Sequence, residues 1–412
     1  MGLAAFLLGT AFAFAFANPR MSNAYDYQFR IARALLHGEL GLHQGFPWLN
    51  EMVPFEGRLY SVFPFGSILC HVPVALMQHA RGNPEYPAHA VVALTGMFIA
   101  LFALALSDRY KDGAARRALL VIWLLWGTWL MPNMVFGSAW QVALGLAVLG
   151  EFGALTFVLT WRNPFLAGFC FAIAFGNRTE LLLTAPLYIY LLTRRDPWRD
   201  GETAPGGGNN GETDWRRRLL RDWRSVAWFC VCPFLLGVAT LWYNAARFHN
   251  PLDFGYARIP GVLDEYWYQP GIFSWQAIAM NVRVMLCDSA WNASTSWPYI
   301  LPTLRGGSIL SICPFLLYLV RPGQRDMVLR RVCWLAIALL LAPVLPHGNS
   351  GGMQFAYRYA LPLLPWIWLL LLDRRGGRIT AWEGVLFAVC LFANGWAVYV
   401  WFWTPPGSPG AI

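Results

Sequence analysis

The stretch "PAHAVVALTGMFIALFALAL" (residues 87–106), followed by "SDRYKDGAARR" (residues 107–117), decides the fold class of this chain. An apolar run of about 20 residues can cross the roughly 30 Å hydrocarbon layer of a bilayer as an α-helix, because a helix satisfies its backbone polar groups internally. The segment that follows carries four basic residues, which is typical of a short cytoplasmic loop. The pair of segments predicts a membrane-spanning helix that ends in the cytoplasm.

The same alternation recurs along the chain and predicts an all-α, polytopic membrane bundle of about 11 spanning helices. Hydrophobic residues make up 57% of the chain and charged residues 13%, against about 25% charged in a soluble domain. The predicted spans are residues 3–17, 87–106, 118–133, 141–160, 164–177, 180–192, 225–246, 299–320, 332–346, 359–372 and 382–403.

The distribution of basic residues predicts the orientation. If the N-terminus is cytoplasmic, 20 of the 31 Lys and Arg residues fall in short loops on that side. Such a bias sets membrane topology, so the net charge of +9 needs no nucleic-acid partner. We therefore expect a multi-pass integral membrane protein with its C-terminus outside.

A Gly- and Asn-rich stretch, "GETAPGGGNNGET" (residues 201–213), predicts a flexible connection. We expect a cytoplasmic linker, residues 193–224, between an N-terminal membrane module, residues 1–192, and a C-terminal module, residues 225–412. Each module is expected to carry a long outer segment, residues 18–86 and 247–298 respectively.

The first outer segment contains two helical patterns. In the first, an apolar stripe and a polar stripe repeat at the same 4-3-4 spacing, which predicts an amphipathic helix lying in the interface with one face in lipid. The stripes are Tyr25, Phe29, Ala32 and Leu36, and Asp26, Arg30, Arg33 and His37. The second, "PFGSILCHVPVALMQHA" (residues 64–80), is expected to lie along the membrane, because a further span here would place the basic loops outside.

Four charged residues are candidates for chemistry. Asp26 either pairs with Arg30 on a solvated helix face or, just after the first span, acts as a general base for a membrane-embedded substrate. Arg358, between two tyrosines, is either a snorkelling anchor or a planar fork that binds phosphate. Arg178 and Glu180 interrupt an apolar region, where a charge pair is costly unless it has a use. Weaker candidates are Asp253, His347 and "DEYWYQPGIFSW" (residues 264–275).

Several segments, taken in order, resemble the GT-C superfamily of polyprenyl-phosphate-sugar-dependent glycosyltransferases, in particular bacterial protein O-mannosyltransferases and lipid A aminoarabinose transferases. They are "SNAYDYQFRIARALLHGELGL" (22–42), "GRLYSVFPFGSILCHVPVAL" (57–76), "FGNRTELLLTAPLYIYLL" (175–192), "HNPLDFGYARIPG" (249–261) and "GGMQFAYRYALPLLP" (351–365).

The resemblance implies an enzyme of a bacterial inner (plasma) membrane, with its active site on the outer face. A sugar would pass from a polyprenyl-phosphate donor to a hydroxyl of a lipid, glycan or protein acceptor, with inversion. Asp26 would be the catalytic base, with Asn23 as the alternative occupant of the family's acidic position. The substrate site would include Arg358, Tyr357, Arg178, Glu180, Asp253 and Tyr256. No cofactor is implied, and the loop "PNMVFGSAWQ" (132–141) lacks a carboxylate, so no metal is expected.

Two other classes compete with an enzyme. A transporter or flippase of lipid-linked sugar should show internal repeats and midplane charges, whereas the charged candidates here lie at the outer face. A structural scaffold would not account for the amphipathic outer helix.

Overall fold

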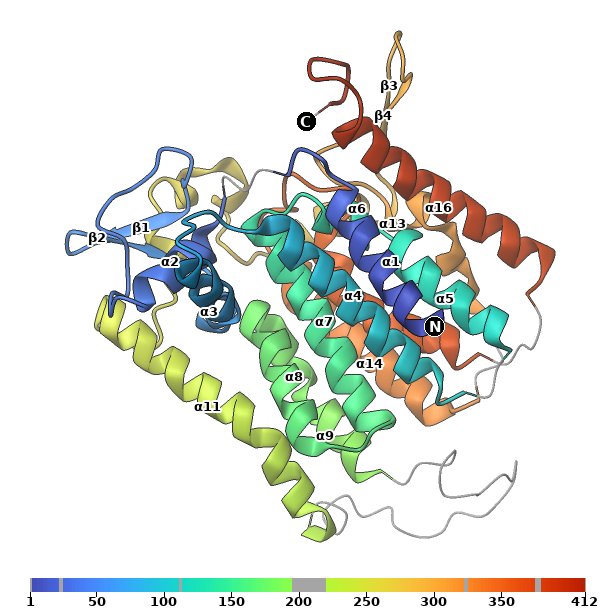
Figure 1. Cartoon of the computed structure of the whole chain (residues 1–412), viewed down its shortest axis with the longest axis horizontal. Helices are drawn as coiled ribbons and strands as arrows, with labels where there is room; N and C mark the ends of the chain where they lie inside the picture. Colours follow the sequence, from blue (N-terminus) through green and yellow to red (C-terminus); the bar gives the residue numbers. More distant parts are fainter. Residues whose placement is uncertain are drawn as a thin grey trace.

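The computed structural model describes residues 2–21, 25–110, 113–194, 220–321, 325–374 and 379–411. This part of the chain is mostly helical, and its long helices run side by side between two ends of the molecule (Figure 1). Asn23 and most of the predicted linker 193–224 lie outside the described residues.

Six helices in the described residues are long and apolar enough to cross a membrane. They are α4 (Ala88–Ser107), the stretch Ala114–Met134 formed by α5 (Ala114–Trp126) and α6 (Leu130–Met134), α7 (Ala139–Leu159), α11 (Trp223–Phe248), α14 (Met327–Val344) and α16 (Ala381–Phe402). The membrane character predicted from composition therefore has a structural counterpart.

Four of the predicted spans form shorter apolar helices. They are α1 (Gly2–Phe16), α8 (Pro164–Asn177), the pair η1 (Thr179–Thr184) and α9 (Ala185–Thr193), and the pair η6 (Arg358–Leu363) and α15 (Leu364–Leu372). In both pairs a 3₁₀ turn becomes an α-helix next to a proline, Pro186 or Pro365, in the first α-helical turn. Proline suits this position because a first-turn N–H has no helical acceptor.

The expectation of one spanning helix over residues 299–320 is wrong. The segment contains β4 (Ile300–Pro302), α13 (Ile309–Ile312) and the 3₁₀ helix η5 (Pro314–Val320). Gly306 adopts a φ of +90°, and Pro314 lacks the N–H that a continuous helix needs. The apolar composition of the segment is compatible with a spanning helix, but Gly306 and Pro314 interrupt the helical backbone.

The basic loops between helices meet at one end of the bundle. Arg116 pairs with Glu383 (3.1 Å), which also lies 3.8 Å from Arg374, next to Asp373. Asp373 accepts a hydrogen bond from the backbone N–H of Asp326 (3.0 Å), and Asp326 pairs with Arg194 (2.9 Å). This ionic chain, as we call it, joins loops from both halves of the sequence.

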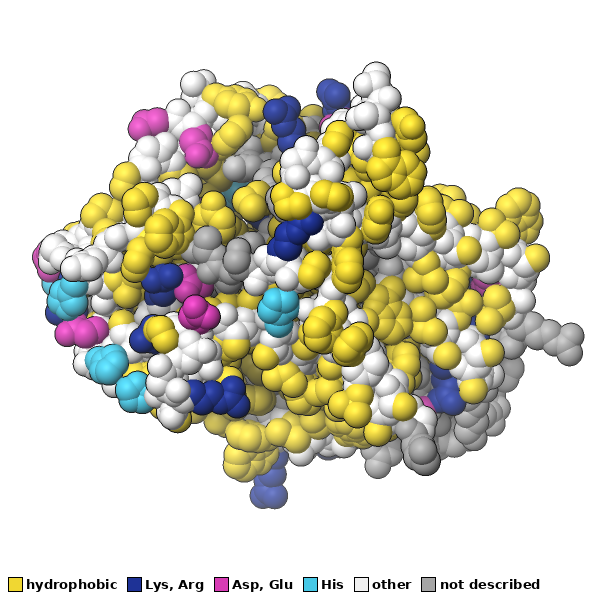
Figure 2. Space-filling model, turned by 45° about the horizontal axis from the view of Figure 1, so that its top comes forward, with side chains coloured by type: hydrophobic (Ala, Val, Ile, Leu, Met, Phe, Trp, Pro, Cys, Tyr) yellow, Lys and Arg dark blue, Asp and Glu magenta, His cyan; other side chains and the backbone are white. Residues whose placement is uncertain are grey.

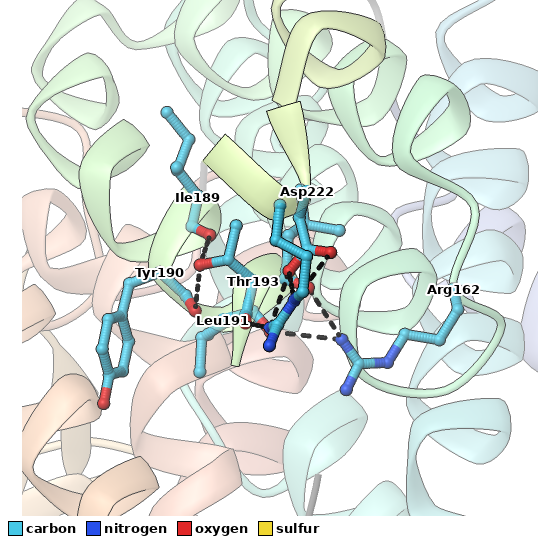
Figure 3. Close-up of polar contacts among 8 residues, drawn as sticks. Arg162, Ile189, Tyr190, Leu191, Thr193 and Asp222 are labelled. Atoms are coloured by element: carbon cyan, nitrogen blue, oxygen red, sulfur yellow. Dashed lines mark hydrogen bonds and ion pairs between the residues drawn. The ribbon is translucent and has the colours of Figure 1, made fainter. Parts of the chain in front are cut away.

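Two further arginines cap the end of α9, next to Arg194 of the ionic chain. Arg162 donates to the carbonyl of Leu191 (3.2 Å), as Figure 3 shows. Arg221 donates to the carbonyl of Thr193 (3.4 Å). The last carbonyls of a helix have no helical donor and carry negative dipole charge, so arginines stabilise the end of α9.

The two halves of the sequence pack against each other along the bundle. α14 contacts η1, α15 contacts α5 and α7, and α16 contacts α5. α11 lies on the outside and packs on α8 (Figure 1), where a Cβ on Gly168 would collide with the carbonyl of Phe229. Glycine therefore permits the close approach of these two helices.

The predicted outer segments, residues 18–86 and 247–298, contribute strands as well as helices, so the fold is not purely α. β1 (Met52–Phe55) pairs antiparallel with β2 (Arg58–Ser61), and β3 (Trp291–Ala293) with β4. The second outer segment also forms η2 (Tyr256–Arg258), η3 (Val262–Asp264), η4 (Tyr266–Tyr268) and α12 (Gln276–Leu286). Charged and histidine side chains gather over the part that holds β1, β2 and α2 (Figures 1 and 2).

Both predicted helices of the first outer segment are present, as α2 (Tyr27–Leu35) and α3 (Phe65–Ala80). The expectation that the apolar stripe of α2 faces lipid is wrong. Phe29 and Ala32 are buried in a cluster with Ile68 and Ala75 of α3. The stripe is covered because the chain between the helices folds back and brings α3 against it.

Candidate functional site

Two predicted arginines lie beside one aromatic ring. The guanidinium carbon of Arg178, at the C-terminal end of α8, is 5.2 Å from the ring centroid of Tyr359, and that of Arg358, at the start of η6, is 5.3 Å from it. Cation–π contact stabilises each charge, but two cations around one ring also repel each other. This arrangement favours an anion between or beside them.

The two arginines have unequal partners. Arg178 forms the predicted ion pair with Glu180 (Nε to Oε1, 2.7 Å). Arg358 is 6% exposed, and its Nε is buried with no hydrogen-bond partner among the residues that the structure describes. A buried charged donor without an acceptor is costly. Arg358 thus supplies a largely buried positive charge to the site.

The loop that leads to Arg358 is fixed by α6 and α7. Asn133 donates to the carbonyl of Phe355 (2.8 Å) and accepts from its N–H (3.2 Å). Gln141 donates to the carbonyl of Met353 (2.7 Å), and the Gln354 side chain accepts from the Arg358 N–H (3.0 Å). These bonds fix the backbone from which the Arg358 side chain extends.

Trp140, next to Gln141 on α7, binds a carboxylate that the sequence analysis did not identify. Trp140 donates from Nε1 to Glu51 (2.8 Å), just before β1. Burial raises the pKa of Glu51, although the Trp140 hydrogen bond and the charge of Arg358 partly offset that rise. Trp140 and Gln141 are neighbours in α7, so they hold Glu51 and the loop of Arg358 side by side. The Glu51 carboxyl and the Arg358 guanidinium are therefore close enough to interact electrostatically.

An aromatic wall surrounds His347. Its ring centroid lies 5.9 Å from that of Tyr359, 5.8 Å from Tyr268 and 6.5 Å from Tyr256. The hydroxyls of Tyr256 and Tyr268 are hydrogen-bonded (2.6 Å). Burial lowers the pKa of His347, and Arg178 and Arg358 lower it further. The lowered pKa favours the neutral form of the His347 ring. Tyr256 and Tyr268, the latter from the run 264–275, lie in the same wall.

Tyr357 lies behind this wall. Its side chain is fully buried, its ring is 5.9 Å from that of Tyr359, and its hydroxyl donates to Asn281 (3.1 Å). Asn281 in turn donates to the carbonyl of His347 (2.7 Å). The geometry makes Tyr357 a support for Tyr359 and His347.

Asp26 and Asp253 have local arginine partners. Asp26, 6% exposed, pairs with Arg30 (2.6 Å), so the ion pair of the first alternative is present, although the carboxylate is buried and not solvated. Burial raises the pKa of Asp26, with Arg30 opposing the rise. Asp253 pairs with Arg258 (2.7 Å). Burial alone would raise the pKa of Asp253, but the interaction with Arg258 outweighs it, so the pKa is lowered.

No group of three or more His, Cys, Asp or Glu side chains in the described ranges is arranged to hold a metal ion. Comparison of the chain with protein-family models, with curated proteins and with solved structures gives no match. The site must therefore be interpreted from its own geometry.

Proposed function

We propose that this chain is a membrane glycosyltransferase that moves a sugar from a polyprenyl-phosphate donor to an acceptor hydroxyl. The observation that carries the proposal is the arginine pair at Tyr359, in which the Arg358 side chain is largely buried. A phosphate is a suitable partner, because a guanidinium can donate two parallel hydrogen bonds to it.

The aromatic wall supports a sugar beside that phosphate. Aromatic faces and tyrosine hydroxyls offer an apolar surface and polar atoms together, and Tyr256, Tyr268, His347 and Tyr359 supply both. The donor sugar would lie against this wall, with its anomeric carbon next to the bound phosphate and the opposite face of that carbon open to the acceptor.

We assign the proton-accepting role to Glu51. Burial brings the pKa of this carboxyl closer to neutral pH, where a general base is most effective, and Arg358 is among its electrostatic partners. Asp26, the carboxylate proposed from the sequence, is held by Arg30 and remains the alternative.

The reaction would proceed in one displacement. The acceptor oxygen forms a bond to the anomeric carbon, while the bond from that carbon to the phosphate oxygen breaks with inversion. The acceptor proton passes to Glu51, and the electron pair of the broken bond stays on the departing polyprenyl phosphate. Arg358 and Arg178 stabilise the charge that develops there.

The proposal is tested with purified full-length protein and short-chain polyprenyl phosphates that carry different sugars. We expect one of them to release polyprenyl phosphate, and release to accelerate when an outer-envelope extract supplies acceptors. A double variant, Arg178→Ala with Arg358→Ala, is the control and should release none. Movement of intact donor across vesicles without cleavage would instead identify a flippase and contradict the proposal.

We propose eleven membrane crossings, with a cytoplasmic N-terminus and the active site at the outer face. The six long helices, the four shorter ones and the broken segment from Ile309 to Val320 would make these crossings. Support comes from the basic loops, which meet at one end and favour the cytoplasmic side.

Cysteine labelling tests this topology in a variant whose eight cysteines are replaced by alanine. Glu56 and Asp108 have similarly exposed side chains, 63% and 70%. Their access to the reagent therefore depends mainly on which side of the membrane they occupy. We expect Glu56→Cys to react with a membrane-impermeant thiol reagent in intact cells, and Asp108→Cys to react only after permeabilisation. The reverse pattern would overturn the orientation.

A further inference from the structure

A surface pocket of about 350 Å³ lies on the polar side of α2, apart from the proposed active site. Its wall combines two arginines, two histidines, an amide and apolar side chains. The lining residues are Arg30, Arg33, Ala34, His37, Leu42, His43, Gln44 and Phe46. The polar stripe of α2, except Asp26, therefore faces a cavity.

Both arginines of the pocket are held in place. Arg30 is fixed between Asp26 (2.6 Å) and the ring of Phe46, 4.1 Å from its guanidinium carbon. Arg33 donates through Nη1 to the carbonyl of Pro84 (2.9 Å). Pre-positioned guanidiniums lose little entropy on binding, and they recognise phosphate by paired hydrogen bonds.

The balance of charge in the pocket is positive. Asp26 offsets the charge of Arg30, and Glu39, which lies 3.8 Å from His43, pairs with Arg58 outside the pocket. Arg33 therefore contributes positive charge, and the rings of His37 and His43 add N–H donors. An anion fits this combination better than a cation or a neutral sugar.

The neighbouring surface of α3 indicates where the anion comes from. The ring of His37 lies 5.7 Å from that of His79, near the C-terminal end of α3. Leu76 and Met77, in the same turn, are 52% and 37% exposed. A basic pocket beside exposed apolar side chains matches a ligand with a charged head and an acyl chain.

We propose that this pocket binds the phosphate headgroup of an anionic phospholipid, whose acyl chains lie along α3. Asp26 then serves as a positioning residue, since it orients Arg30 in the pocket wall. The proposal is independent of the glycosyltransferase proposal, because it concerns none of the residues around Tyr359.

The test measures binding of a short-chain phosphatidylglycerol to purified full-length protein, with phosphatidylcholine of the same chain length as the comparison. We expect phosphatidylglycerol to bind at least about tenfold more tightly, and Arg33→Gln to weaken it by about tenfold or more, as expected for a lost charge-assisted hydrogen bond. His43→Gln, at a side chain 65% exposed, provides a second variant with little risk to folding and should weaken binding several-fold.

The matched control is Arg81→Gln, which removes the same charge from an exposed position at the end of α3, outside the pocket. It should leave binding unchanged. Equal weakening by Arg81→Gln would reveal general surface attraction, and equal binding of the two lipids would exclude headgroup recognition. Displacement of the lipid by an equal concentration of inorganic phosphate would identify free phosphate as the ligand. Any of these last three results, namely equal weakening, equal binding or displacement by phosphate, would overturn the proposal.

Discussion

Glu51→Gln is expected to lower the rate of sugar transfer by about 10²- to 10⁴-fold while donor binding stays near normal. The substitution keeps the shape of the side chain and an oxygen that accepts from Trp140, but the amide cannot take a proton. A loss of this size is typical of removing a general base. Single-turnover transfer and donor titration on the purified variant separate the two effects.

The matched variant is Asp26→Asn, which removes the same charge from a buried carboxylate in the same predicted outer segment. If Asp26 acts by holding Arg30, its loss should reduce turnover less than about tenfold, since Arg30 lines a different pocket. The opposite ranking of the two variants would return the catalytic role to Asp26.

The pH dependence gives the same experiment a second readout. A general base works when deprotonated, so transfer should be present above the pKa of Glu51 and lost as the pH falls through it. Because burial raises that pKa, the loss should begin at a higher pH than for an ordinary glutamate. The residual activity of Glu51→Gln should lack this acidic limb.

Arg358→Lys is expected to reduce transfer by about 10²- to 10³-fold, the usual cost of removing one donor from a developing anion. Lysine keeps the charge, but its ammonium cannot present two parallel N–H groups to phosphate. The loop around Arg358 is anchored independently by Asn133 and Gln141, so the fold should survive. Transfer rate and thermal unfolding in detergent are measured together.

Arg283→Lys is the control, because its side chain is 76% exposed and pairs with Asp288. It should match the parent in both measurements. If Arg358→Lys also transfers sugar at the parental rate, Arg358 is an interfacial anchor and the phosphate site must be sought elsewhere.

The sequence located the arginines but not the carboxylate beside them, for a physical reason. Arg178 and Arg358 stand out because a charge inside an apolar region is unusual wherever the rest of the chain goes. Glu51 lies in a stretch without helical periodicity. Its proximity to Trp140 and Arg358 depends on the packing of segments far apart in the chain, which no local pattern encodes.

For the helices, too, local features were predictable from the sequence and tertiary packing was not. The 4-3-4 stripe correctly predicted the helix α2, because periodicity is a local property of the sequence. It did not say what covers the stripe, and α3 rather than lipid does so. Over residues 299–320 hydrophobicity favoured a span, whereas Gly306 and Pro314 govern the backbone locally and break it.

The ionic chain at the basic end bears on how the protein can move. Arg116, Glu383 and Asp326 have side chains at most 7% exposed, and leaving one charge of such a pair buried without its partner costs about 3–5 kcal/mol. Rocking the two halves apart at this end, as alternating access requires, would incur that cost in every cycle. In the orientation that we propose, this end is cytoplasmic and stays closed, so the proposed lipid-borne donor would enter sideways from the outer leaflet and leave the same way.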